Sequence, residues 1–213
     1  MSNFILKSNI LNCDSCIIFI HGVKGNASEA KIYKFLTNKY DVIGLDYEDG
    51  NAWEVNKIIS EEFEKIVSNY KHINVIANSI GAFYTFTYLT NFNIEKALFI
   101  SPFVSMKEEV EEGLKYSKLT QEEFKEKKFI YNKDHTLISY DFYNFMENFQ
   151  LKWSKETFII YGENDEMVPR KCIDEFVNKT KSNLFVYPNG KHYFYTLDEL
   201  RFIKKYALNI FEK

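Results

Sequence analysis

The stretch INVIANSIGAFYTF, residues 73–86, decides how the rest of the chain is interpreted. Its first part, residues 73–77, is apolar and rich in β-branched side chains, which is typical of a buried strand. After NSIG the apolar residues continue at helical spacing to about Thr90. The stretch therefore predicts a buried strand that turns directly into a helix, with Ser79 at the turn.

The same alternation of strand and helix extends outward from this stretch. Short apolar runs without polar alternation are typical of strands covered on both faces, and we expect them at 16–20, 41–46, 73–77, 96–101, 157–161 and 184–187. Helices lie between them, and their starts are expected at the capping boxes 26–29, 51–54 and 196–199 and at Pro169. Strands that alternate with helices predict one α/β domain over residues 1–213, with a doubly wound, mostly parallel sheet of about six strands.

One segment interrupts this rhythm. Residues 103–152 are too many for a simple connection between two strands. The segment begins with the charged run KEEVEEGLKYSK, has a capping box at 120–123 and ends in the aromatic run YDFYNFMENF. We expect an inserted helical lid of about residues 103–152, and a long surface excursion is the alternative.

The composition is that of a folded, globular chain. Of its 213 residues 46% are hydrophobic and 27% are charged, and the net charge is −3. So small a net charge gives no electrostatic reason to expect nucleic acid or an anionic membrane as a partner. Residues 1–16 lack the long apolar core of a signal peptide, and the run CIIFI is too short to span a bilayer. We therefore expect a cytoplasmic protein without a membrane partner.

The chain has three cysteines, Cys13, Cys16 and Cys172, and all are expected to be free thiols in the cytoplasm. Cys13 and Cys16 form a C-x-x-C pair. In a thioredoxin-like site this pair follows a strand and opens a helix, whereas here it precedes the strand expected at 16–20. A second C-x-x-C is absent, so we expect no zinc site.

Reactive residues of a parallel α/β sheet are sought just beyond the carboxyl ends of its strands. Ser79 follows one expected strand, and a nucleophile on so sharp a turn needs small neighbours two residues before and after it. Gly81 meets this need, and Ala77 is the smallest alternative to the usual Gly. A Ser at a helix start is also a common cap, so these residues alone leave both interpretations open.

A serine hydroxyl needs a base, and the base needs a carboxylate to orient it. His192, in PNGKHYF, follows the last expected strand, while Asp165, in YGENDEMVP, follows the one before it. His72 precedes its strand and so belongs to the opposite edge of the sheet, and His135 lies in the insertion. A surface loop histidine and an ordinary acidic loop are the alternatives. Two other acidic residues near Asp165 compete with it, Glu163 and Glu166, and both are expected to be solvated.

An anionic intermediate would need preorganised backbone N–H groups. The residue after the serine, Ile80, supplies one, and the loop HGVKGN after the first strand supplies another, for which Val23 is the candidate. His21 and Gly22 are expected to shape this loop, so we do not take His21 as the base.

Four segments in one order, HGVKG, ANSIG, GENDEMVP and GKH, resemble the α/β-hydrolase superfamily, whose triad runs Ser–Asp–His along the chain. The resemblance covers nearly the whole chain except the insertion and the first dozen residues. It implies Ser79 as nucleophile, Asp165 as triad acid and His192 as base, with Val23 and Ile80 as oxyanion donors. It implies no cofactor and no metal, and a small acyl compound as substrate.

The chain departs from the family pattern in two places. Ala77 replaces the first Gly of the turn, which resembles some lipases and esterases of the family. The N-terminus is short, so we expect one or two of the antiparallel strands that often open this fold to be missing, which resembles the compact members. A nucleophilic Asp is absent, which disfavours dehalogenase and epoxide-hydrolase chemistry.

The resulting hypothesis is a serine hydrolase of carboxylic esters or related acyl compounds. A thioesterase or peptidase of the same fold, a non-catalytic binding protein on this scaffold and a thiol oxidoreductase at C-x-x-C are the alternatives. The sequence leaves open the acyl group and the oligomeric state. It also leaves open whether the aromatic residues of the insertion line an acyl pocket or only pack: Tyr140, Phe142, Tyr143, Phe145 and Phe149.

Overall fold

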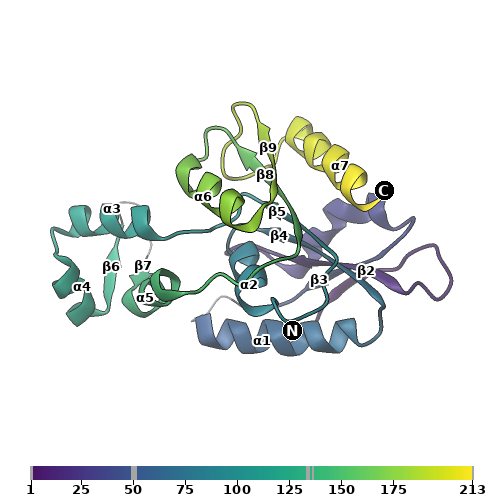
Figure 1. The fold of residues 1–213 in the computed structure, drawn as a ribbon, viewed down its shortest axis with the longest axis horizontal. Coiled ribbons are helices and arrows are strands. Elements are labelled where there is room, and N and C mark those ends of the chain that lie inside the picture. The colour runs from purple at the N-terminus through teal and green to yellow at the C-terminus, as the bar shows by residue number, and fades with distance from the viewer. Residues whose placement is uncertain (1, 49–51, 133–134, 136, 213) are drawn as a thin grey trace. The chain divides into compact units, whose positions relative to one another are not determined.

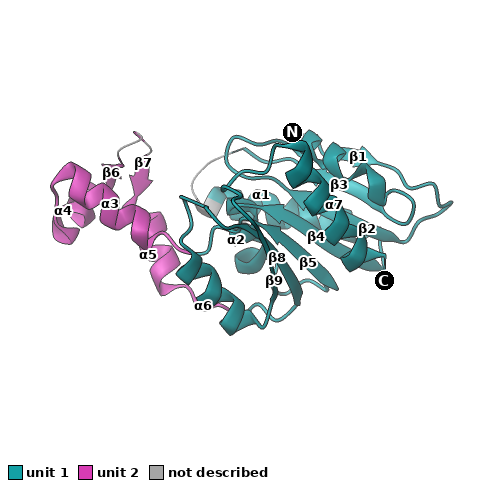
Figure 2. Ribbon diagram, turned by 90° about the horizontal axis from the view of Figure 1, so that it is seen from above, with its two compact units in different colours: residues 1–104, 152–213 teal, residues 105–151 magenta. Residues whose placement is uncertain are grey.

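The computed structural model describes residues 2–48, 52–132, 135 and 137–212 (Figure 1). The chain divides into two compact units (Figure 2). Unit 1 consists of Met1–Val104 and Lys152–Lys213, and unit 2 is Ser105–Leu151.

Unit 1 is built on a seven-stranded sheet with the order β1-β3-β2-β4-β5-β8-β9. Every neighbouring pair is parallel except β1 and β3, which are antiparallel. The strands are β1 (Phe4–Leu6), β2 (Ser15–Ile20), β3 (Asp41–Leu45), β4 (His72–Asn78), β5 (Lys96–Ile100), β8 (Glu156–Gly162) and β9 (Asn183–Tyr187). The predicted class, a mostly parallel α/β sheet, is confirmed.

The sequence predicts the six parallel strands but not β1. This strand has only three residues, and Ile5 at its centre is 51% exposed, so it carries no buried apolar run. It exists because its backbone completes the edge of β3, where Ile5 pairs with Ile43. One antiparallel opening strand is therefore present.

Helices cover both faces of the sheet (Figure 1). Helices η1 and α7 contact each other on one face. Helices α1 and α2 contact each other on the other face, where Phe86 of α2 also packs on Phe176 of α6 at 4.9 Å between ring centroids. Their bounds are η1 (Ala27–Leu36), α1 (Ala52–Val67), α2 (Ile80–Tyr88), α6 (Arg170–Thr180) and α7 (Leu197–Phe211).

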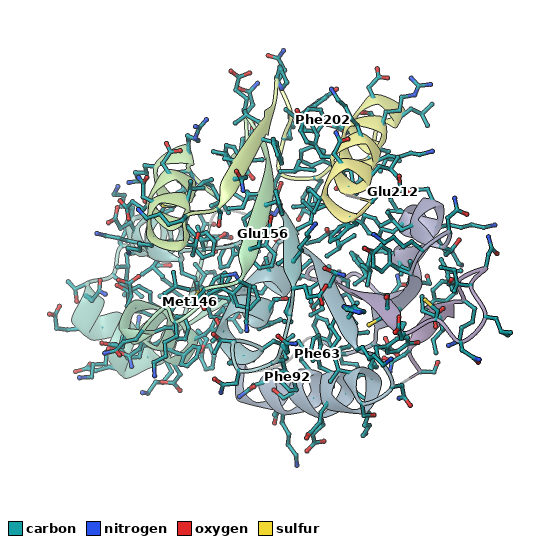
Figure 3. The ribbon with its side chains drawn as sticks, turned by 45° about the vertical axis from the view of Figure 1, so that its right-hand side comes forward. Phe63, Phe92, Met146, Glu156, Phe202 and Glu212 are labelled. Carbon is teal, nitrogen blue, oxygen red and sulfur yellow. The ribbon has the colours of Figure 1, made fainter. Side chains whose placement is uncertain are left out.

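The core of unit 1 lies in the two layers between sheet and helices. A cluster below η1 and α7 includes Phe19, Tyr33 and Phe211, each no more than 1% exposed. On the opposite face, the rings of Phe63 in α1 and Phe92 after α2 meet edge to face at 4.9 Å (Figure 3). Since both faces of the parallel strands are covered, only their ends are open to ligands.

Capping contacts confirm two of the predicted helix starts in unit 1. The capping boxes 26–29 and 196–199 are both formed, with reciprocal side-chain and backbone hydrogen bonds. The box predicted at 51–54 begins at Asn51, which lies outside the described residues. Pro169 is the residue before α6 and not its first helical residue, and η1 is a 3₁₀ helix.

Unit 2 contains α3 (Lys107–Ser117), α4 (Gln121–Lys127), β6 (Phe129–Tyr131), β7 (Leu137–Ser139) and α5 (Tyr140–Asn148). The capping box at 120–123 is formed. The sequence does not predict the antiparallel β6–β7 pair, which is only three residues long on each strand. Fully buried Phe124 packs against the rings of Tyr140 and Tyr143 at 5.2 and 6.0 Å. At least these two aromatic residues pack within the unit, and its action as a lid stays a prediction.

Candidate active site

Ser79 lies on a strained turn between β4 and α2. Its backbone has φ 50° and ψ −119°, a region that non-glycine residues rarely occupy, and its side chain does not cap the helix. Two backbone hydrogen bonds fix the turn: the Ser79 N–H donates to Ile100 O at 2.9 Å, and the Phe103 N–H donates to Ser79 O at 3.0 Å. The chain leaving β5 therefore supports the turn from the neighbouring strand.

The end of β2 lies close to the turn at Ser79 and leaves little space for side chains there. A Cβ atom on Gly81 would collide with the carbonyl oxygen of His21 and would lie 2.6 Å from that of Ile20. Ala77, which pairs with Ile20 across β2 and β4, is fully buried. Ala77 therefore lies in an enclosed position one residue before the end of β4.

His192 connects Ser79 to Asp165. Its Nε2 lies 2.9 Å from Ser79 Oγ, and its Nδ1 lies 2.8 Å from Asp165 Oδ2. The side chains of His192 and Asp165 are only 4% and 0% exposed, so the pair is shielded from water. A carboxylate only accepts hydrogen bonds, so Nδ1 must carry a proton; in the neutral ring, Nε2 is then free to accept the serine proton.

The second oxygen of Asp165 anchors the carboxylate. Oδ1 accepts the backbone N–H groups of Met167 and Val168, each at 2.9 Å. Because these contacts occupy Oδ1, the carboxylate presents Oδ2 to His192 in one orientation. Glu166 is exposed, as the sequence predicts.

Backbone contacts join the loop of Asp165 to the loop of His192. The Asn164 N–H donates to Gly190 O at 2.7 Å. A Cβ atom on Gly162 would collide with the backbone at Lys191 and would lie 2.6 Å from Gly190. The exposed Glu163 accepts the Asn189 N–H at 2.9 Å, a structural contact that the sequence does not predict. In the sequence, only Gly162 of GEN and Gly190 of NGK indicate that these two loops meet.

The two predicted oxyanion donors lie in segments that flank Ser79. A side chain on Gly22 would meet Ser79 Cβ at 3.3 Å, so the loop after β2 passes beside the serine. In this loop the Gly25 N–H donates to Gly22 O at 3.0 Å and closes a turn that has Val23 at its second position. Ile80 is the first residue of α2, where N–H groups have no partner within the helix. Oxyanion binding by Val23 and Ile80 stays a prediction.

His21 is held in place by contacts with Gly22 and Tyr47. Its Nδ1 lies 2.9 Å from Gly22 O, and its ring stacks on Tyr47 at 4.0 Å. The other two histidines lie elsewhere. His72 starts β4, at the opposite edge of the sheet from Ser79, and pairs with Glu95 at 2.7 Å, whereas His135 belongs to unit 2.

The C-x-x-C residues lie just before and within β2 and not at the start of a helix, as the sequence predicts. Both thiols are free, and Cys16 is fully buried. Burial raises the pKa of the Cys16 thiol to about 12, which disfavours its thiolate form. Cys13 instead donates its thiol hydrogen to backbone carbonyl oxygens, those of Ser15 and Lys39 lying at 3.2 and 3.4 Å.

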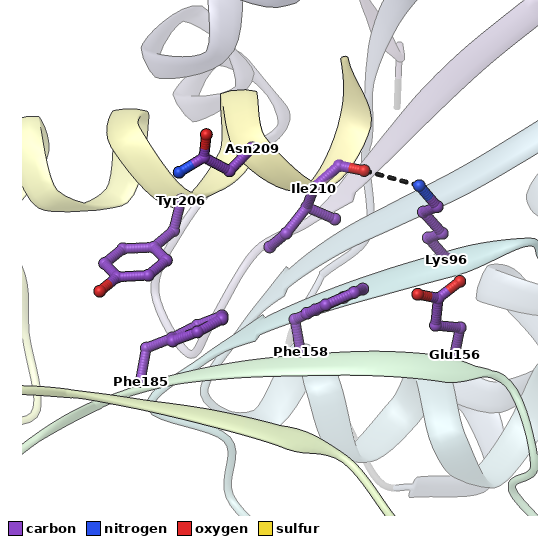
Figure 4. Close-up of a pocket in the computed structure, with 7 residues that line it drawn as sticks. All are labelled: Lys96, Glu156, Phe158, Phe185, Tyr206, Asn209 and Ile210. Carbon is purple, nitrogen blue, oxygen red and sulfur yellow. Dashed lines mark hydrogen bonds between the residues drawn. The ribbon is translucent and has the colours of Figure 1, made fainter. Parts of the chain in front are cut away.

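A separate pocket of about 380 Å³ lies toward the amino ends of β5 and β8 (Figure 4). Its wall includes Lys96 and Glu156, the first residues of these strands, and Lys96 donates to Ile210 O at 2.7 Å. Ser79 follows the last residue of β4, so this pocket lies at the opposite edge of the parallel sheet from Ser79, Asp165 and His192.

Within the described ranges, no group of three His, Cys, Asp or Glu residues is arranged to hold a metal ion. No helix in these ranges is long and apolar enough to cross a bilayer.

A model of the Uncharacterised protein family UPF0227 matches residues 16–207. The match runs from the start of β2 into α7 and includes Ser79, Asp165 and His192. No curated protein is similar enough in sequence to count as a match.

Several solved structures share the fold. Est1E from Butyrivibrio proteoclasticus is 17% identical, with a TM-score of 0.75, over 99% of this chain and 94% of that one. Alpha/beta hydrolase domain-containing protein 10 from mouse is 17% identical, with a TM-score of 0.71, over 99% and 93%. The Bacillus cereus carboxylesterase is 14% identical, with a TM-score of 0.63, over 99% and 95%. The chain therefore has the α/β-hydrolase fold that its motifs resemble.

Proposed function

Because the chain belongs to the family UPF0227 and has the α/β-hydrolase fold, we propose that it is a serine hydrolase of carboxylic esters or related acyl compounds. One observation carries the proposal. Ser79 Oγ, His192 and Asp165 form a continuous chain of contacts of 2.9 and 2.8 Å, with Ser79 on a turn of positive φ. Nothing in the packing of an α/β sheet requires these three residue types to meet at its edge.

The reaction uses this chain of contacts in two halves. In the first, Ser79 Oγ attacks the carbonyl carbon while His192 Nε2 takes its proton. The bond from carbon to the leaving oxygen breaks, and His192 returns the proton to that oxygen. In the second, water loses a proton to His192 Nε2 while its oxygen attacks the acyl carbon. The bond from that carbon to Ser79 Oγ then breaks, and His192 returns the proton to Oγ, so that Ser79 and the neutral imidazole are regenerated.

Three features lower the energy of the charged species: the Asp165 carboxylate, two backbone amides and the N-terminus of α2. Asp165 faces the protonated imidazole, and its buried position strengthens that interaction relative to water. The amides of Val23 and Ile80 bind the oxyanion of each tetrahedral intermediate, and one such donor contributes about 3–4 kcal/mol in related sites. The N-terminus of α2 adds a favourable dipole at the same place.

A screen with graded acyl chains tests the proposal. Esters and thioesters of one alcohol or thiol, from acetyl to long fatty acyl groups, are offered to the wild-type protein and to Ser79→Ala as the blank. We expect hydrolysis well above the blank for at least one acyl group. If no ester, thioester or simple amide is turned over faster than by the blank, the proposed reaction class is wrong. The preferred chain length also tests the lid: a preference for long chains supports an acyl pocket lined by aromatic residues of unit 2.

A further inference from the structure

Exposed apolar side chains occur in three of the loops near Ser79, Asp165 and His192. In unit 1 these are Val23 (59% exposed) in the loop after β2, Met167 (37%) beside Asp165, and Tyr193 (51%) and Tyr195 (73%) after His192. Exposed apolar side chains that lie together, unlike single ones, are favoured at ligand sites. Tyr193 and Tyr195 also follow His192, the base of the proposed triad, so a substrate held at Ser79 could reach their rings.

The rings of these tyrosines form a row that begins at the imidazole. The Tyr193 ring meets the His192 ring edge to face, with 5.0 Å between centroids and 90° between planes. Tyr195 then stacks on Tyr193 at 5.5 Å and 18°. We call Tyr193 and Tyr195 the tyrosine pair. It extends from a nearly buried imidazole out to largely exposed rings.

The backbone under the tyrosine pair is anchored. Glu199, in the first turn of α7, accepts the N–H groups of Tyr195 and Thr196 at 2.9 and 2.8 Å. Burial alone would raise the pKa of Glu199, but these hydrogen bonds outweigh it and hold the pKa below its ordinary value. The pair therefore stands on a fixed segment between His192 and α7, and its exposed rings are preorganised for a ligand.

The position of the tyrosine pair identifies the part of a substrate that would reach it. His192 Nε2 must come within about 3 Å of the leaving oxygen to protonate it. The substituent on that oxygen therefore lies next to the imidazole, where Tyr193 packs. The acyl part is bonded to Ser79 Oγ after the first half-reaction and need not approach these rings.

We propose that Tyr193 and Tyr195 form a leaving-group subsite that takes a planar aromatic alcohol, such as a benzyl or aryl group. This inference rests on the proposed serine hydrolase and adds the alcohol side of its substrate. Paired aromatic rings attract each other beyond what burial of their area provides, whereas a saturated ring gains only the burial term. An aromatic alcohol should thus be favoured about two- to tenfold over a saturated one of equal size.

Two esters of one acid, chosen from the screen, test the subsite: the benzyl and the cyclohexylmethyl ester. Their alcohols have the same number of carbon atoms, and the ratio of their kcat/KM values is compared between protein variants, so intrinsic reactivity cancels. We expect Tyr195→Leu to lower the benzyl to cyclohexylmethyl ratio, and Tyr193→Leu/Tyr195→Leu to lower it further, by about two- to tenfold in total. The variant Tyr193→Phe/Tyr195→Phe retains both rings and should keep the benzyl to cyclohexylmethyl ratio of the wild type. Thermal unfolding checks that each variant folds.

Three results would overturn the subsite. An unchanged ratio in Tyr193→Leu/Tyr195→Leu would mean that the alcohol does not reach these rings. Equal losses on both esters would mean that the pair only supports His192. A ratio that stays low in the Phe variant would assign the effect to the hydroxyl groups and not to the rings. In each case Ser79-dependent hydrolysis would persist, so the serine hydrolase proposal would survive; if the wild type hydrolyses neither this acid's esters nor any other, both proposals fall.

Discussion

Ser79→Ala is expected to lower kcat for the best ester by about six orders of magnitude, the scale on which loss of a triad serine acts. The variant keeps the oxyanion donors and the binding surface but has no atom to attack the carbonyl carbon. Ala fits the same turn, because Ser79 makes no cap contact and its side chain is small. The folded state loses one hydrogen bond, to His192, worth about 1 kcal/mol. The measurement is steady-state hydrolysis together with thermal unfolding.

Ser101 is a matched control for this substitution. It directly follows β5, the strand next to β4, is buried and also has a positive φ of 43°. Its Oγ has no hydrogen-bond partner among the described residues. Ser101→Ala should therefore change kcat by less than tenfold. Retention of more than a tenth of the wild-type rate by Ser79→Ala, with protein of the same purity, would contradict the account.

Asp165→Asn has the second largest expected effect, a loss of about 10⁴ in kcat. The amide oxygen of the substituted side chain can keep the two contacts from Met167 and Val168, so its NH₂ group then faces His192 Nδ1. An N–H donor there favours the tautomer with the proton on Nε2. That nitrogen can no longer accept the proton of Ser79, although the fold and the distances are preserved.

The same loop provides the control for this prediction. Glu166 is an exposed carboxylate next to Asp165, and Glu166→Gln removes the same charge without changing the contact to His192. Its kcat should stay within a few fold of wild type. The two variants are compared at one pH on the ester used for Ser79→Ala. A similar small loss in both would show that Asp165 contributes only through its charge, and would remove it from the triad.

The sequence was sufficient to predict the framework of the site. Apolar runs indicated the six parallel strands, and their ends placed Ser79, Asp165 and His192 at one edge of the sheet. This worked because the side-chain pattern of a strand covered on both faces is strong and because parallel strands share a carboxyl edge. The capping box at 196–199 likewise indicated the start of α7 without reference to tertiary structure.

The features that the sequence missed are made by backbone atoms or by tertiary contacts. Gly162 contacts the backbone at Gly190 and Lys191, and a contact between backbone atoms leaves almost no pattern of side chains in the sequence. Strand β1 is held by the edge of β3, and its three residues are too few to show a period. The row of rings from His192 to Tyr195 depends on how one loop is fixed at Glu199, which the local sequence does not specify.

Labelling with a fluorophosphonate tests the central claim most directly, because it asks whether Ser79 is an activated nucleophile without needing the natural substrate. Ser79 Oγ would form a bond to phosphorus as the phosphorus–fluorine bond breaks, with the proton passing to His192 and fluoride leaving. The account predicts one adduct per chain, found by peptide mass spectrometry on the peptide that contains Ser79, formed far more slowly in Asp165→Asn and absent after unfolding. A folded wild-type protein that forms no adduct, or forms it on a residue other than Ser79, would contradict the account.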